Sequence, residues 1–390
     1  MSHPLPPPGQ PPGPPPGPPP GQSPGSQQPS YPPETGPVGP AGTAPAPRGA
    51  VTLSAEEFAA AYPPLEYHRL HRAGDRGWWR PVVGVVVAAV SMVLVLSMVT
   101  LALFALGLAV VGADVGDGVD QMLSLDTVTP LSLAYLLSTL ALLTPVVWLV
   151  TRYLHGLRPG WTTSVAPRMR WGYFLACAGL SVVALVASLV VSVLVSALDP
   201  GAVPEGSEVG SLNAFTETTR NFLFVVLLVT PFQAAGEEYL FRGYVTQVAG
   251  GIFSSPRVAT AVAIVVPAVL FALAHGAQSP PVFFDRLAFG VMAGYLVIRT
   301  GGLEASIAMH VMNNWFAFGL ALAVGDMDEV LTPSGGSWLT LPVTLTQTLV
   351  YLALAVLVHR GMGLARAADS AVLIGSRGRV YGLSSAPPGA

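Results

Sequence analysis

Long runs of apolar residues without a single charge constrain this chain more than any other feature. Three of them cover residues 81–111, 131–151 and 171–198. A helix needs about 20 apolar residues to cross a hydrocarbon core about 30 Å thick, so each run is long enough to span a membrane. Charged residues make up 10% of the chain, whereas soluble domains contain about 25%. The sequence therefore predicts an integral membrane protein.

Five further apolar runs bring the number of candidate spans to about eight. They cover residues 221–236, 258–274, 287–298, 303–324 and 339–358. Arginines cluster before the first run, within residues 69–80, and after the last, within residues 360–379. Loops kept in the cytoplasm carry the basic excess, and both clusters lie on one side only if the number of spans is even. The sequence therefore predicts an all-α polytopic bundle of about eight transmembrane helices with both termini in the cytoplasm.

The chain divides into four parts by composition. Residues 1–50 hold 20 of the 38 prolines and 9 of the 42 glycines and almost no large apolar side chain. Such a segment cannot offset the entropy lost on ordering, so we expect a disordered Pro/Gly-rich tail. We expect a juxtamembrane segment at residues 51–80, the transmembrane bundle at residues 81–359 and a flexible basic cytoplasmic tail at residues 360–390.

Composition and missing motifs exclude several functional classes. The net charge is −3, so no nucleic-acid partner is expected. The single cysteine, Cys177, has no partner for an intrachain disulfide. Neither the Gly-rich P-loop of nucleotide hydrolases nor the His-Glu-x-x-His motif of soluble zinc proteases occurs in the sequence. Any chemistry must therefore come from residues dispersed within the bundle.

The first polar group at membrane depth consists of Glu237, Glu238 and Arg242. An ionisable residue inside a membrane costs at least about 2.5 kcal/mol, and such residues mark candidate functional sites. In a helix, Glu238 and Arg242 are four residues apart with the acid first, which favours an ion pair. Glu237 points about 100° away and has no such partner on its own helix. The alternative interpretation, a solvated helix end, is equally compatible with these residues.

The second and third polar groups each combine a histidine with a distinctive neighbour four residues away. Phe271 and His275 share one helical face, and His310 and Asn314 share another. A lone His or Asn in a span more often forms an interhelical hydrogen bond than takes part in catalysis. However, only two of the seven histidines fall in apolar segments, and each has a distinctive neighbour four residues away. Their combination with a carboxylate therefore favours a catalytic site.

One carboxylate, two imidazoles and one carboxamide in a hydrated membrane cavity suit hydrolysis. The carboxylate can take a proton from water, while the imidazoles position that water or bind a metal. The amide can donate a hydrogen bond to the developing oxyanion. One Glu with two His is also a known ligand set for catalytic zinc, which leaves a position for water.

These residues resemble the motifs of the CPBP intramembrane proteases, a family that includes the type II CAAX prenyl endopeptidases and the bacterial Abi-type proteins. The family has three motifs on successive membrane segments. In this chain they read Glu237-Glu238-x-x-x-Arg242, Phe271-x-x-x-His275 and His310-x-x-x-Asn314. The resemblance covers residues 215–325. It implies a helical bundle with a cavity that opens to the cytoplasm and the lipid, where a peptide bond is cleaved near the membrane surface.

The resemblance also implies a role for each motif residue. Glu237 would be the general base for the attacking water, His275 and His310 would bind that water or a metal, and Asn314 would donate to the oxyanion. The residues that would orient the site are Glu238, Arg242 and Phe271. If a divalent metal is present, zinc is the expected ion, with Glu237, His275 and His310 as its ligands. The implied partners are a membrane-associated peptide or protein substrate and the lipid bilayer.

Two alternatives to a protease remain open. The same acid and histidines could form a proton relay or ion site in a transporter, or the protein could be a non-catalytic scaffold. No internal repeat of the kind found in transporters is evident. The arginine-only basic residues and the composition rich in Ala, Gly, Pro and Val are typical of a high-GC bacterium, so we expect the plasma membrane of such an organism.

The simplest eight-span topology has one difficulty. Glu237 would lie near the cytoplasmic end of its helix and His310 about 10 Å from the same side, whereas His275 would lie about 25 Å beyond the start of its span. The three side chains meet only if the segment before His275 is displaced or tilted, or if the helix before Glu237 begins outside the bilayer and places Glu237 deeper.

Overall fold

The structure is a computed structural model that describes residues 64–75, 77–124, 127–198, 212–276, 278–331 and 337–368. The expected disordered tail at residues 1–50 and most of the expected basic tail after residue 368 lie outside the described residues. Within the described part, 8 helical segments are long and apolar enough to cross a membrane. The prediction of an all-α polytopic bundle with about eight spans is therefore confirmed.

Five of the eight segments are single helices, and the other three are composite. The single helices include α8 (Trp171–Leu198), α11 (Pro256–Ala274), α12 (Pro280–Thr300), α13 (Glu304–Val324) and α15 (Thr340–Gly361). The first segment joins α2 (Trp79–Val90) and α3 (Leu96–Val110) through a π-helical turn, Ser91–Val95. The second joins α5 (Pro130–Ala141), α6 (Leu143–Leu149) and the π-helical turn Val150–Leu154.

The fourth segment carries the glutamate motif and is the longest of the eight. It consists of α9 (Glu217–Glu238), the π-helical turn η5 (Tyr239–Val245) and α10 (Thr246–Ile252). The remaining short elements lie before the first span, between the spans or after the last one. They are β1 (Leu65–Glu66), the 3-10 helix η1 (Tyr67–Ala73), α4 (Val115–Leu123), α7 (Gly160–Thr163), α14 (Met327–Leu331) and β2 (Ala367–Ala368).

The sequence marks several helix boundaries with capping residues. Thr216 accepts a hydrogen bond from the backbone of Thr219 at the start of α9, and the two side chains form a capping box. Proline stands at the start of α11 and of α12, where its missing N–H leaves no helical hydrogen bond unmade. Gly276 ends the turn after α11 with φ of 76°, a left-handed conformation that favours glycine.

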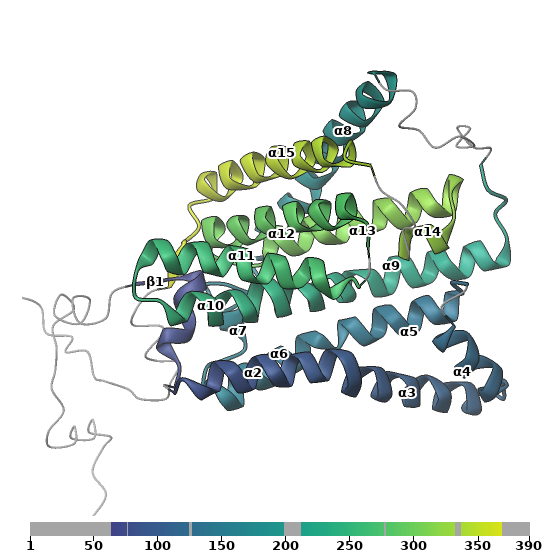
Figure 1. The fold of residues 1–390 in the computed structure, drawn as a ribbon, viewed down its shortest axis with the longest axis horizontal. Helices are drawn as coiled ribbons and strands as arrows, with labels where there is room; N and C mark the ends of the chain where they lie inside the picture. Colours follow the sequence, from purple (N-terminus) through teal and green to yellow (C-terminus); the bar gives the residue numbers. More distant parts are fainter. Residues whose placement is uncertain are drawn as a thin grey trace, which may run out of the picture. The chain divides into compact units, whose positions relative to one another are not determined.

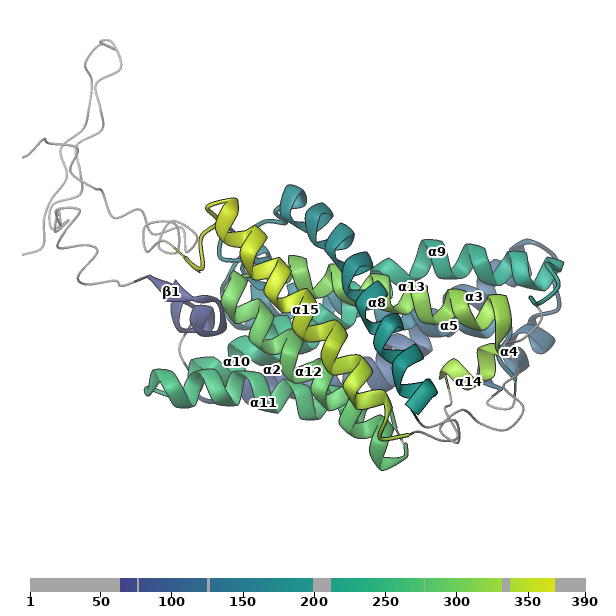
Figure 2. The same cartoon turned by 90° about the horizontal axis from the view of Figure 1, so that it is seen from above.

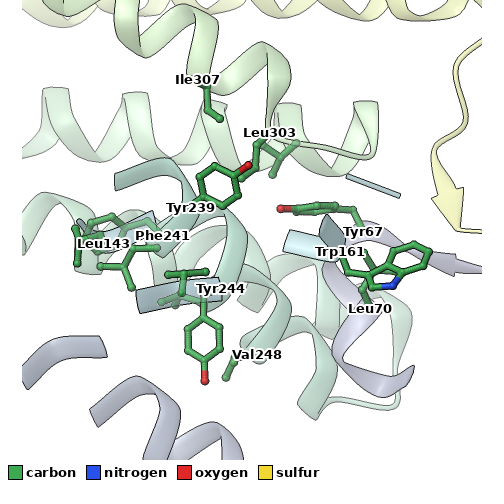
Figure 3. Packing of buried hydrophobic residues seen from close by; sticks show 14 of the residues in the cluster. Tyr67, Leu70, Leu143, Trp161, Tyr239, Phe241, Tyr244, Val248, Leu303 and Ile307 are labelled. Atoms are coloured by element: carbon green, nitrogen blue, oxygen red, sulfur yellow. The ribbon is translucent and has the colours of Figure 1, made fainter. Parts of the chain in front are cut away.

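The helices pack in an order that places α9 at the centre of the site. Helix α9 contacts both α5 and α13, and α13 also contacts α8. On the other side, α11 packs against α12, α12 against α15, and α15 against α8, as Figures 1 and 2 show. A large buried cluster surrounds η5, where Tyr239, Phe241 and Tyr244 pack with Leu303 and Ile307 (Figure 3).

Aspartates of the connecting helices and arginines at the ends of the spans gather at opposite ends of the bundle, although Arg220 pairs with Glu217 at the aspartate end and Asp75 with Arg80 at the arginine end. Helices α4 and α14, which contain aspartates, lie at one end in Figure 1, while β1, α7 and α10 lie at the other. The arginine-bearing ends of α2, α11 and α15 belong to this second end, where β1 pairs antiparallel with β2 and η1 packs on α10. This separation of charge is the pattern on which the predicted orientation depends.

The segment before the first span closes the arginine-bearing end. Tyr67 is fully buried and its hydroxyl donates to the carbonyl of Thr162. Arg72 donates from Nε to the carbonyl of Gly251 at 3.0 Å, at the end of α10. The part of the expected juxtamembrane segment that the structure describes is thus packed against the same composite helix that carries the glutamates.

Candidate active site

The helix that carries Glu237 does not end there, because α9 continues through η5 into α10. The composite segment Glu217–Ile252 contains 36 residues, and Glu237 lies well inside it. Glu238 and Arg242 are both fully buried. The interpretation of this group as a solvated helix end is therefore wrong. The physical reason is that the residues after Glu238 find buried partners, as the packing of Tyr239, Phe241 and Tyr244 shows (Figure 3).

The extended helix removes the difficulty over the depth of His275. From Glu237 the helix advances about 22 Å to Ile252, and α11 then runs back for about 28 Å before it reaches His275. The two lengths are similar, so the histidine returns to the level of the glutamate. The continuation of the helix past Glu238, which neither of the two arrangements considered from the sequence included, accounts for this return.

Glu238 is the anchor of a buried hydrogen-bond network. Its Oε1 accepts from Nη1 of Arg242 at 2.9 Å and from Nδ1 of His310 at 2.9 Å. The hydroxyl of Ser306, one turn before His310, donates to Oε2. The expected ion pair between Glu238 and Arg242 is present. Because Nδ1 of His310 faces a carboxylate, it carries a ring proton and donates; in the neutral form of the ring, Nε2 is then the acceptor.

Arg242 combines this ion pair with an aromatic contact. Its guanidinium carbon lies 4.0 Å from the centre of the Phe271 ring, a cation–π geometry. The Phe271 ring also contacts His275 and His310 edge-on, with ring centres 4.8 and 6.0 Å away. One aromatic ring therefore supports the arginine and both imidazoles of the three motifs.

Glu237 points away from this network, as its helical position requires. Its Oε1 accepts from Nε2 of Gln233 at 2.9 Å. Its Oε2 lies 3.6 Å from Nε2 of His310 and is buried without a hydrogen-bond partner among the described residues. One carboxylate oxygen is thus held in place, and the other is free to accept a proton.

Gln233 links the glutamate to the asparagine, and sequence reasoning missed it. Its Oε1 accepts from Nδ2 of Asn314 at 3.0 Å, while its Nε2 holds Glu237. The signal was present in the sequence, because Gln233 is a polar residue in an apolar run, four residues before Glu237 and so on the same helical face. An asparagine side chain has two N–H donors, so Asn314 keeps one for another partner.

His275 completes the site from the end of α11. Its Nδ1 is 2.8 Å from the carbonyl of Phe271, so this nitrogen carries the proton and donates, and Nε2 is left as an acceptor. His275, Glu237, His310 and Asn314 all line one cavity of about 490 Å³. The structure thus brings the four expected catalytic side chains to a single cavity.

The predicted zinc ligands do not form a metal site as they are placed in this structure. A carboxylate and two acceptor imidazole nitrogens would suit zinc chemically. In the part of the chain that the structure describes, however, no group of three or more His, Cys, Asp or Glu side chains is arranged to hold a metal ion. The metal stays a prediction, and none of the steps proposed below passes through it.

The fold and the site together define a polytopic helical membrane protein with a carboxylate, two histidines and an asparagine around a cavity inside the bundle. The family comparison agrees with this arrangement. Residues 219–316 match the model described as type II CAAX prenyl endopeptidase Rce1-like. The matched stretch runs from the first turn of α9 into α13 and includes all three motifs.

The comparison with curated proteins adds a distant relative, and the comparison with solved structures adds none. The chain is 24% identical over 216 residues to the protein named "Uncharacterized protein YyaK" from Bacillus subtilis (strain 168), a match that covers 53% of this chain and 66% of that protein. The matched part is just under two thirds of the length of this relative. No solved structure matches the chain significantly.

Proposed function

We propose that the protein is an intramembrane endopeptidase that hydrolyses a peptide bond of a membrane-associated peptide or protein. The observation that carries the proposal is the free Oε2 of Glu237, buried at the cavity wall beside an acceptor nitrogen of His310. A buried carboxylate oxygen without a partner is costly, so its retention requires an explanation. Acceptance of a proton from a cavity water molecule is the chemistry that this geometry supports best.

The attacking water would be held by two acceptors. The water would donate one hydrogen bond to Oε2 of Glu237 and the other to Nε2 of His310. These two atoms are 3.6 Å apart, so a single water molecule can contact both. The water oxygen then attacks the carbonyl carbon of the substrate while its proton passes to Glu237. The tetrahedral intermediate then collapses with cleavage of its C–N bond to a carboxylic acid, while Glu237 delivers that proton to the leaving amine and returns to the carboxylate form.

Asn314 lies on α13 and His275 at the end of α11, so the two would contact the substrate from two different helices that line the cavity. The second N–H of the Asn314 amide donates to the oxyanion that forms at the attacked carbonyl. The first remains bonded to Gln233, which keeps the amide in place. His275 offers Nε2 as an acceptor beside the Phe271 ring, where it can hold the leaving amine or the water. Arg242 and Glu238 would orient His310 without contact with the substrate.

The orientation of the protein belongs to the same proposal. The arginine-bearing end would face the cytoplasm of a bacterial plasma membrane, with both termini on that side. The only cysteine of the sequence, Cys177, is buried, so a single cysteine introduced at either end of the bundle would be a unique label. Labelling by a membrane-impermeant maleimide from outside intact cells at the β1 end would contradict this orientation.

Glu237→Gln is the variant that tests the activity. The change keeps the shape of the side chain but removes the proton acceptor, so we expect at least a hundredfold loss of peptide hydrolysis. The assay is comparative proteomics of membrane-associated peptides from cells that express the wild type or the variant. Wild-type membranes would be measured with and without a zinc chelator, and loss of activity with the chelator would support the predicted metal.

Glu217→Gln is the matched control for this experiment. Glu217 is at the first turn of the same helix, exposed and far in sequence from the cavity. Peptide profiles identical for the wild type, Glu217→Gln and Glu237→Gln would contradict the protease proposal. They would favour the scaffold or transporter alternatives, in which no peptide bond is broken.

A further inference from the structure

The cavity contains one permanent cation that the proposed mechanism does not use. Among the described residues that line it, Arg286 is the only arginine, and lysine does not occur in the chain. Arg286 lies on α12, in the second turn after Pro280, and α12 contributes none of the three motifs. A guanidinium group at membrane depth is costly in free energy, so an arginine there marks a candidate functional site.

Arg286 forms no ion pair with the described carboxylates. Among the described residues, Arg286 donates from Nη1 to Oε1 of Gln278 at 2.6 Å, and Gln278 in turn donates from Nε2 to the carbonyl of Ala272 at 2.6 Å. The neutral Gln278 therefore fixes the guanidinium to the end of α11 without neutralising its charge. Since a guanidinium has five N–H donors in a planar fork, most of them remain available for a ligand.

A contrast within the same chain shows that this arrangement is unusual. The two arginines that are fully or almost fully buried, Arg170 and Arg242, each contact a buried glutamate at less than 3 Å. Both therefore have their countercharge inside the fold. Arg286 is half-buried and lines the cavity, where the carboxylates of Asp285 and Glu237 act on its charge without forming a direct ion pair, so its N–H donors stay available to a carboxylate of a substrate.

We propose that Arg286 is a specificity-determining residue that binds a carboxylate group of the peptide substrate, an inference that rests on the proposed endopeptidase function. The planar guanidinium matches a carboxylate in a two-point contact, which gives both charge and direction. The carboxylate can come from the free end of the peptide or from an Asp or Glu side chain, and both present the same chemistry.

Asp285 provides a second point of contact in the same part of the cavity. It also lines the cavity, and its Oδ1 is buried without a hydrogen-bond partner among the described residues. Asp285 and Arg286 are consecutive on α12 and therefore point about 100° apart. The arginine would hold the carboxylate of the substrate, and the aspartate would accept a backbone N–H from the same peptide. An acceptor and a donor side by side would fix the direction in which the peptide lies.

Randomised octapeptides with a fluorophore and a quencher test this inference in purified protein. Four pools are compared, with a free or an amidated carboxyl end and with or without Asp and Glu in the sequence. We expect the pool without any carboxylate to be cleaved about tenfold to a hundredfold less efficiently, mainly through a higher KM, because one charge-assisted contact is lost. If amidation of the carboxyl end alone produces this loss, the bound carboxylate is the free terminus. If omission of Asp and Glu alone produces it, the bound carboxylate is a side chain.

Arg286→Gln should remove the preference, so that the four pools become equivalent, while Arg286→Lys should keep part of it. Arg299→Gln is the matched control, because Arg299 lies on the same helix but outside the cavity. Equal cleavage of all four pools by the wild type, or an unchanged preference in Arg286→Gln, would overturn the inference and leave the endopeptidase proposal intact.

Binding measurements separate the two proposals. The same four pools are titrated onto the Glu237→Gln variant, which retains the cavity but not the proton acceptor. Preferential binding of carboxylate-bearing pools without any cleavage by the wild type would support the role of Arg286 and contradict the protease. Absence of both binding preference and cleavage would overturn both.

Discussion

Arg242→Met removes the cation from the buried pair with Glu238 and keeps a side chain of similar length. Removal of one partner of a buried ion pair costs about 3–5 kcal/mol, because the other charge is left without compensation. Glu238 retains Nδ1 of His310 and the hydroxyl of Ser306 as donors, so the lower part of this range applies. The lost contact with the Phe271 ring adds about 1 kcal/mol. We therefore expect the free energy of unfolding to fall by about 3–4 kcal/mol.

Reversible unfolding in mixed detergent and sodium dodecyl sulfate measures this change. The double variant Glu238→Gln/Arg242→Met should recover about 2 kcal/mol relative to the sum of the single variants, because it leaves no unpaired charge. An exposed pair on the same helix, Glu217 and Arg220, is the matched control, with N···O of 2.8 Å and both side chains at least half exposed. Loss of that pair should cost less than about 0.5 kcal/mol.

The reasoning fails if Arg242→Met unfolds within about 1 kcal/mol of the wild type. Such a result would mean that Glu238 is neutral in the fold or that water reaches it. A small loss in the single variant with no recovery in the double variant would lead to the same conclusion. The description of Glu238 as a charged anchor for His310 would then have to be abandoned.

Two further predictions concern Asn314, in the site, and His155, which lies just after the second span. Asn314→Ala should lower peptide hydrolysis about 100-fold or more without loss of fold, since it removes an oxyanion donor. Asn221→Ala, near the start of α9 and outside the cavity, should not, and equal rates in both variants would contradict the assignment. Burial lowers the pKa of His155 to about 4 from an ordinary value near 6.5, so the unfolded chain takes up a proton at a higher pH than the folded protein. The free energy of unfolding should therefore fall as pH drops from about 6.5 to about 4, by at most about 3 kcal/mol and less where solvent screens the ring. His155→Gln, which can keep the hydrogen bond to Tyr244, should reduce that slope, and an unchanged slope would contradict it.

The parts of the fold that the sequence predicted well are those that depend on one segment alone. Runs without charge predicted the first three spans, because insertion into lipid depends on the hydropathy of each segment by itself. The pairing of Glu238 with Arg242 was likewise a local matter of helical spacing. The expected number of spans and the expected pair are both present in the structure.

The continuation of α9 past Glu238 could not be predicted in this way. Its residues include polar side chains whose partners come from distant parts of the chain, so their hydropathy gives no indication of a span. Tyr239 pairs with Thr163 at 2.8 Å, and Gln247 donates to the carbonyl of Trp161 at 2.8 Å. These contacts satisfy the polar atoms only after the chain has folded, which a pattern along the sequence cannot show.

The two adjacent glutamates show how one helical step divides two functions. Glu238 faces the protein, where three donors hold a carboxylate that also fixes the proton of His310 on Nδ1. Glu237 is rotated by about 100°, so it receives only one donor, Gln233, and keeps an oxygen free toward the cavity. The first glutamate can act as a base because the second has already taken the available cations and donors. If the two glutamates exchanged surroundings, Glu237 would have no free oxygen and Glu238 would have no donors for its carboxylate. The two roles therefore depend on the order of the glutamates and on the arginine four residues after the second one.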